Sequence, residues 1–156
     1  MTQARAPSHW VHARATNSRP LPVRCSSGVS AVVRVSADGL DGVVWERWLR
    51  FPSARTYIRS VKRPRQAHTL LECVDGGLGM VLTVFERGGG LVFESQSYFL
   101  VLGARRVPIP TLLTPGRCSV THSAVGSRHF VYDLVMRHSL WGTTFRQVGT
   151  FEDPEG

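Results

Sequence analysis

Apolar and polar residues alternate along most of the chain after residue 28. Between Val29 and Val35, apolar side chains occupy every second position, which is the period of a half-buried strand. Glycine-rich turns separate such stretches, and no stretch has a helical period. The pattern predicts an all-β domain of about eight or nine antiparallel strands. Because consecutive hairpins need no long crossover, we expect an up-and-down curved sheet or a partly closed barrel.

The central hairpin is expected between Met80 and Leu102, around the glycines at 88–90. A two-residue turn at Gly88-Gly89 would give the register Glu86–Leu91, Val84–Phe93 and Leu82–Ser95. We favour this register because it gathers one apolar face, made of Leu82, Val84, Leu91 and Phe93.

A later hairpin, around Gly126-Ser127, carries the most reactive set of side chains. A two-residue turn there would place His122, His129 and Asp133 on one face. Two imidazoles and a carboxylate can hold a divalent metal or relay a proton, so an acid/base or metal-dependent enzyme is one alternative. An ordinary solvent-facing strand explains the same residues more simply, and the sequence favours that interpretation and a non-enzymatic role.

Composition divides the chain into three parts. Residues 1–24 contain three prolines and no regular period, which predicts a disordered or loosely docked basic arm. Residues 25–151 form the β domain, and residues 152–156 form an acidic tail. Cys25, Cys73 and Cys118 lie far apart and are expected to be buried free thiols. No apolar run is long enough for a membrane-spanning helix or a signal peptide, so we expect a cytoplasmic protein.

The chain is basic, with a formal net charge of +8. Basic residues are concentrated between residues 47 and 65, where anion binding is expected of Arg47, Arg50, Arg55, Arg59 and Arg63. Such a field could attract nucleic acid or an anionic surface. A solvated sheet face is the favoured interpretation, and binding to nucleic acid is the alternative.

Motifs for nucleotide, zinc or serine-hydrolase chemistry are missing from the sequence, and no cofactor is expected. A curved sheet of this size can still enclose a pocket for one small apolar ligand. Ser95, Gln96 and Ser97 interrupt an apolar strand and could orient such a molecule. The sequence therefore favours a binding module for an apolar small molecule or lipid.

Short motifs follow one another in a fixed order between residues 22 and 151, at positions 45–47, 50–51, 55–59, 77–79, 88–90, Gly103, 107–110, 112–113, Pro115, 128–134, 140–142 and 145–146. These motifs and their order resemble the bacterial family known as domain of unknown function 4166. The chain departs from the family pattern at Thr121 and His122, where an acidic residue is usual, and at Gln147, where glycine is usual.

The resemblance implies a β-rich domain that sometimes follows nicotinamide-dependent oxidoreductase domains. An NAD(P)-dependent oxidoreductase is therefore an expected partner. The resemblance supplies no catalytic residues. Since the usual N-terminal lead-in is missing from the matched pattern, a shortened member or a misplaced start is expected.

Overall fold

The computed structural model describes residues 9–16, 29–51, 53–127 and 129–152. These residues form eleven strands and one short 3-10 helix, so the all-β prediction is confirmed. The strands are β1 (His9–Thr16), β2 (Val29–Ala37), β3 (Val43–Arg50), β4 (Arg55–Gln66), β5 (Thr69–Val74), β6 (Leu78–Arg87), β7 (Gly90–Leu102), β8 (Arg105–Ile109), β9 (Arg117–Val125), β10 (His129–His138) and β11 (Gly142–Glu152), and the helix η1 spans Thr111–Leu113.

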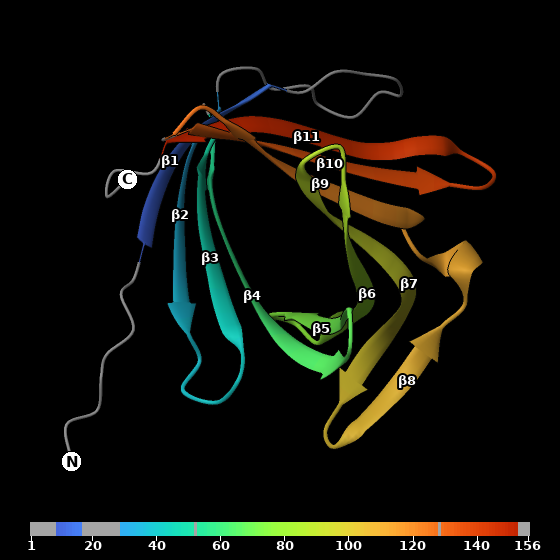
Figure 1. Cartoon of the computed structure of the whole chain (residues 1–156). Coiled ribbons are helices and arrows are strands. Elements are labelled where there is room, and N and C mark those ends of the chain that lie inside the picture. Colours follow the sequence, from blue (N-terminus) through green and yellow to red (C-terminus); the bar gives the residue numbers. More distant parts are fainter. Residues whose placement is uncertain (1–8, 17–28, 52, 128, 153–156) are drawn as a thin grey trace, which may run out of the picture.

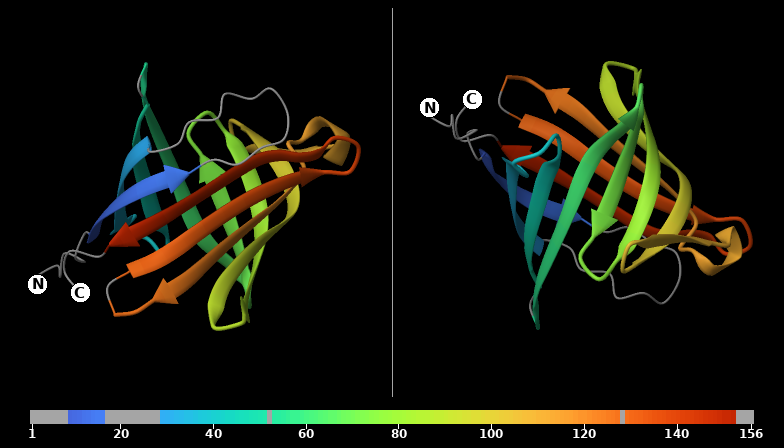
Figure 2. Two further views of the ribbon diagram at one scale, coloured as in Figure 1. Left: turned by 90° about the horizontal axis from the view of Figure 1, so that it is seen from above. Right: turned by 90° about the horizontal axis from the view of Figure 1, so that it is seen from below.

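The sheet is antiparallel and closes on itself. Each strand from β1 to β7 pairs with the next, β7 also pairs with β9, and β1 pairs with β11. Ten strands therefore form an up-and-down barrel, and β8 extends from it as the outer partner of β7 (Figure 1). Figure 2 shows the strands β9–β11, in orange and red, crossing the green strands of the opposite wall at a large angle. This crossing follows from the strand tilt that closure of a twisted sheet requires.

Two strands lie in segments that the sequence predicted to be irregular. Residues 9–16 belong to the expected loose arm but form β1, between β2 and β11, so that prediction is wrong for them. The rest of the expected arm and residues 153–156 of the expected tail lie outside the described residues. The proline-rich connection after Leu102 contains β8, which pairs only with β7, and an edge strand tolerates Pro108.

Pro64 does not end its strand, contrary to the sequence-based expectation. β4 continues to Gln66, although its pairing with β3 stops at Lys62. Beyond that point β4 has a partner on one side only, where Pro64 pairs with Leu70 of β5. A proline is tolerated here because it lies past the end of the β3 ladder.

The central hairpin has the predicted register. β6 and β7 pair Glu86 with Leu91 and Val84 with Phe93 across the two-glycine turn. Leu82 pairs with Ser95, and a bulge at Gln96 follows. Leu82 and Phe93 belong to the core, whereas Leu91 lies near the end of the hairpin and is exposed. The hairpin is therefore part of the barrel wall.

The hairpin of β9 and β10 does not have the predicted register. Val125 pairs with His129, so the connection contains three residues instead of two. His122 consequently pairs with Tyr132 and not with Val131. Paired residues of neighbouring strands lie on the same face of the sheet. A register shift of one residue therefore places His122 with Tyr132 on the inner face.

Two clusters of buried residues lie inside the barrel. One contains Ala31, Val33, Tyr132 and Phe151; the other contains Met80, Leu82, Phe93, Tyr98 and Cys118. Val120 and Leu134 pack against both clusters and connect them. Among the described residues, no helix is long and apolar enough to cross a membrane.

Candidate ligand-binding site

The space between the two core clusters is incompletely filled. A cavity of about 230 Å³ lies there, and a smaller one of about 50 Å³ adjoins it. The two cavities share six wall residues, which are Trp45, Arg47, Leu49, His122, Tyr132 and Gln147. Because a water molecule occupies about 30 Å³ in the liquid, the larger cavity equals roughly eight waters. The barrel therefore encloses room for a small molecule.

Most of the cavity wall is hydrophobic. β6 and β7 contribute Met80, Leu82 and Phe93, while β9 and β10 contribute Val120 and Leu134. Phe145 of β11 lines the larger cavity and is 39% exposed, so this part of the wall reaches the protein surface. Apolar walls with a few polar groups are typical of small-molecule sites.

The polar part of the wall is a charged cluster formed by Arg47, Lys62 and Glu72. Lys62 and Glu72 are cross-strand partners on β4 and β5, and Lys62 Nζ lies 2.8 Å from Glu72 Oε1. Arg47 of β3 approaches the same oxygen, with Nη2 at 3.7 Å. Two cations therefore share one carboxylate inside the barrel.

Burial and charge shift the pKa values of this cluster. Burial lowers the pKa of Lys62, and the nearby Arg47 guanidinium lowers it further, against the effect of Glu72. Burial alone would raise the pKa of Glu72, but Lys62 and Arg47 together hold it below its ordinary value. Glu72 is therefore ionised, as a carboxylate between two cations must be.

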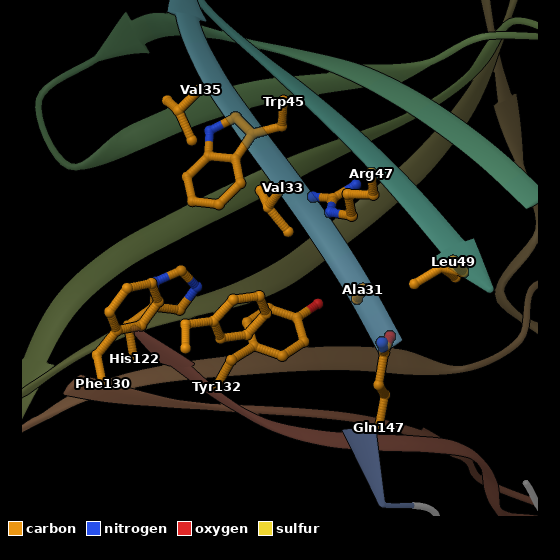
Figure 3. Close-up of a pocket in the computed structure, with 11 residues that line it drawn as sticks. Ala31, Val33, Val35, Trp45, Arg47, Leu49, His122, Phe130, Tyr132 and Gln147 are labelled. Atoms are coloured by element: carbon orange, nitrogen blue, oxygen red, sulfur yellow. The ribbon is translucent and has the colours of Figure 1, made fainter. Parts of the chain in front are cut away.

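Trp45 forms the aromatic side of the charged cluster. Lys62 Nζ lies 4.7 Å from the centre of its ring, and the Arg47 guanidinium carbon lies 5.7 Å away. Figure 3 shows Trp45, Arg47 and Leu49 on the same side of β3. This matches the sequence pattern, in which these alternate residues of the strand share a face. Cation–π contacts stabilise both charges away from bulk water.

His122 lies among aromatic rings in the cavity wall. Its ring centre is 5.3 Å from that of Tyr132 and 5.5 Å from that of Phe93, with Trp45 and Phe130 slightly farther away. Figure 3 shows His122 beside Phe130 and Tyr132. Burial, assisted by the nearby Lys62 and Arg47 cations, lowers the pKa of His122 to about 4. The imidazole is therefore neutral near pH 7.

The structure does not bring the predicted reactive triad together. His122 faces the cavity, whereas Asp133 follows the inward-facing Tyr132 and lies on the outer face, bonded to Arg146 at 2.9 Å. His129 is exposed and lies on the same outer face as Asp133, because the two residues are four positions apart on β10. The prediction of a shared face is wrong because of the register shift in this hairpin. Within the described residues, no group of three or more metal-ligating side chains forms a candidate metal site.

The three polar residues of β7 are also separated. Ser95 is buried, and its Oγ accepts a hydrogen bond of 2.8 Å from the Cys118 amide. Gln96 and Ser97 are exposed at the bulge. Ser95 therefore links β7 to β9, and the predicted trio does not line the cavity.

Four of the five predicted anion-binding arginines lie on the outer face of β3 and β4, and one faces inward. Arg47 faces the cavity, while Arg50 and Arg55 form an exposed cross-strand pair. Arg59 contacts Asp75 at 3.4 Å, and Arg63 contacts Asp38 at 2.9 Å. The outer arginines therefore share one face, where acids neutralise two of the four, and Arg47 lies apart from them.

The predicted site residues did not include three of the cavity's polar residues, Lys62, Glu72 and Gln147. A lone acid within the apolar run of β5 was the available signal for Glu72, because a charge in such a run is expected to have a buried partner. Cys118, predicted to be a buried thiol, does lie in the core, and burial raises its pKa to about 12. Cys73 is a free thiol that is partly buried.

Comparison with solved structures supports the fold. The crystal structure of Rv2717c from M. tuberculosis is similar, with a TM-score of 0.60 over 93% of this chain and 90% of that chain. The two sequences are 13% identical, so the likeness concerns the fold alone. No curated protein sequence matches this chain.

The family comparison covers nearly the whole sequence. The family model for a domain of unknown function, DUF4166, matches residues 1–151, and thus extends further towards the N-terminus than the motifs between 22 and 151. The chain therefore belongs to the DUF4166 family.

Proposed function

We propose that this protein is a binding module that holds one small, largely apolar molecule inside its barrel. The observation that carries this proposal is the cavity of about 230 Å³ between the two core clusters. Protein interiors are normally packed without voids of this size, since each void forfeits dispersion contacts. A ligand in the cavity would restore those contacts.

The composition of the wall supports an apolar ligand. Leu82 and Phe93 of the β6–β7 hairpin and Leu134 of β10 face the same space. Burying apolar ligand surface against them is favourable by about 25 cal/mol per Å². The neutral His122 and the amide of Gln147 add polar groups that could orient the molecule.

Binding of a small neutral solvatochromic dye such as 4-(dimethylamino)benzonitrile, whose size suits a cavity of about 230 Å³, tests this function. We expect a fluorescence increase with wild-type protein and competition by 1-octanol, which is small and mostly apolar. In the variant Leu134→Trp the larger side chain fills the cavity, so the fluorescence increase should be lost. Thr150→Trp is the matched control, because Thr150 is exposed on β11.

Two measurements keep the test decisive. Circular dichroism and thermal unfolding establish that each variant is folded, and Val120→Phe provides a second way to fill the cavity if Leu134→Trp does not fold. Equal dye binding by wild type and a folded, cavity-filled variant would place the dye on the outer surface and overturn the proposal.

A further inference from the structure

The charged groups that face the cavity do not balance. Arg47 and Lys62 are cations and Glu72 is the carboxylate between them, while His122 is neutral. By formal charge, two basic side chains and one acid leave the cavity wall with one positive charge in excess. A buried charge without a counter-charge is costly, so an anion inside the cavity would be favoured.

The excess charge resides mainly on Arg47. Lys62 is engaged by Glu72 at hydrogen-bond distance, 2.8 Å. Arg47 has only a loose approach of 3.7 Å to that carboxylate, and its one hydrogen bond to a described residue is a long one, 3.4 Å, from Nη1 to Ser60 Oγ. A guanidinium offers five N–H donors, so most of the donors of Arg47 are available to a ligand.

The surroundings of Arg47 define the shape of this ligand. The guanidinium lies beside Trp45, at the boundary between the charged cluster and the apolar wall. A planar carboxylate matches the fork of a guanidinium with two parallel hydrogen bonds. The remaining volume, lined by residues such as Met80 and Phe93, suits an unbranched or compact apolar body.

We infer that the natural ligand is a monocarboxylate with an apolar body, held with its carboxylate at Arg47 and its body against the hydrophobic wall. This inference rests on the proposed binding function and specifies its ligand class. The Lys62–Glu72 ion pair carries no net charge and lies next to the position of the ligand's carboxylate. The ligand supplies the counter-charge that the charged cluster lacks.

Isothermal titration calorimetry with matched probes tests the inference. Octanoate, 1-octanol and octylamine share one apolar chain and differ in the charge of the head group. We expect wild-type protein to bind octanoate at least about tenfold more tightly than 1-octanol, which corresponds to one strong charge-assisted interaction. Octylamine should bind most weakly, because its cation meets an excess of positive charge.

Arg47→Met is the informative variant. It removes the excess charge and leaves the Lys62–Glu72 pair intact. We expect the preference for octanoate over 1-octanol to disappear, with 1-octanol binding changed less than threefold. Arg47→Lys retains the charge and should keep part of the preference. Arg50→Met is the matched control, because Arg50 lies on the same strand but is exposed.

The outcomes separate the two proposals. If neither octanoate nor 1-octanol binds, the proposed function itself fails. If wild type binds both equally, or Arg47→Met keeps the preference, the cavity binds apolar molecules but the carboxylate inference is overturned. Arg47→Met should fold, because removing a buried charge that lacks a full counter-charge relieves a cost. Thermal unfolding of both Arg47 variants verifies that they are folded.

Discussion

Lys62 and Glu72 are direct cross-strand partners inside the barrel, with Nζ and Oε1 2.8 Å apart and both side chains largely shielded from water. Arg47 lies near the same carboxylate. This pairing makes a charged cluster part of a mostly apolar interior. Glu72 is the acid that both cations approach.

Glu72→Gln should destabilise the protein by about 3 kcal/mol, because two buried cations then lack a counter-charge. The measurement is urea unfolding near pH 7. Asp133→Asn is the control, since it breaks an exposed pair with Arg146 and should cost less than about 1 kcal/mol. Similar losses in both variants would contradict the role given to the buried cluster.

His122 should make the stability pH-dependent. Its pKa is about 4 in the folded protein, against an ordinary value of 6.5, so the unfolded chain binds more protons between these values. Stability is therefore expected to fall as the pH drops from 6.5 to 4, by up to about 3 kcal/mol from this residue. Unfolding free energies measured across this range check the expectation.

His122→Phe is the companion variant for that measurement. Phenylalanine preserves an aromatic ring next to Phe93 and Tyr132 but cannot be protonated. The free energy of unfolding of the variant should change less than that of the wild type over the same pH range, although Glu72 still titrates in both. An identical pH profile for wild type and variant would show that His122 is not the group responsible.

Gly116→Ala should destabilise the protein more than Gly76→Ala. The two glycines have nearly the same φ, +100° and +98°, so the backbone cost of alanine is similar at both. A Cβ at Gly116 meets the backbone of Arg137, whereas one at Gly76 meets nothing within 4 Å. The difference between the two midpoints of thermal unfolding therefore measures the cost of the clash between the alanine Cβ at position 116 and the Arg137 backbone. Equal midpoints would mean that β9 and β10 separate easily at this point.

Gln147→Ala should shift ligand preference towards longer chains. Gln147 lines both cavities, and truncating it joins more space to the site. We expect the ratio of decanoate to octanoate affinity to rise several-fold over wild type, since each added buried CH₂ contributes about 0.8 kcal/mol. Thr150→Ala, at an exposed position of the same strand, should leave the ratio unchanged. A constant ratio in both variants would indicate that chain length is limited elsewhere.

Turn glycines and the alternation of apolar and polar residues were sufficient to predict much of the fold. The glycines at 88 and 89 set the register of β6 and β7, because only one two-residue turn places Leu82 and Phe93 on the same face. Alternation likewise assigned Phe130 and Tyr132 to the inner face of β10. These features depend on residues close together in the sequence.

The sequence-based prediction failed at the turn of the β9–β10 hairpin, where a two-residue connection was assumed. The Gly126-Ser127 pair suggested the shorter turn, but only a three-residue connection places Cys118, Val120 and Ala124 of β9 opposite the apolar face of β10. The structure has the longer one, and His122 therefore faces the cavity instead of joining Asp133. A single residue of register decided whether this histidine belongs to an outer face or to the interior.

The sequence alone determined an antiparallel β domain, its central hairpin and the common face of Trp45 and Arg47. Only the tertiary structure decided that β1 pairs with β11 and that the barrel encloses a cavity. The physical reason is that strand propensity and alternation are local, whereas closure and the meeting of Arg47 with Glu72 depend on contacts between distant segments.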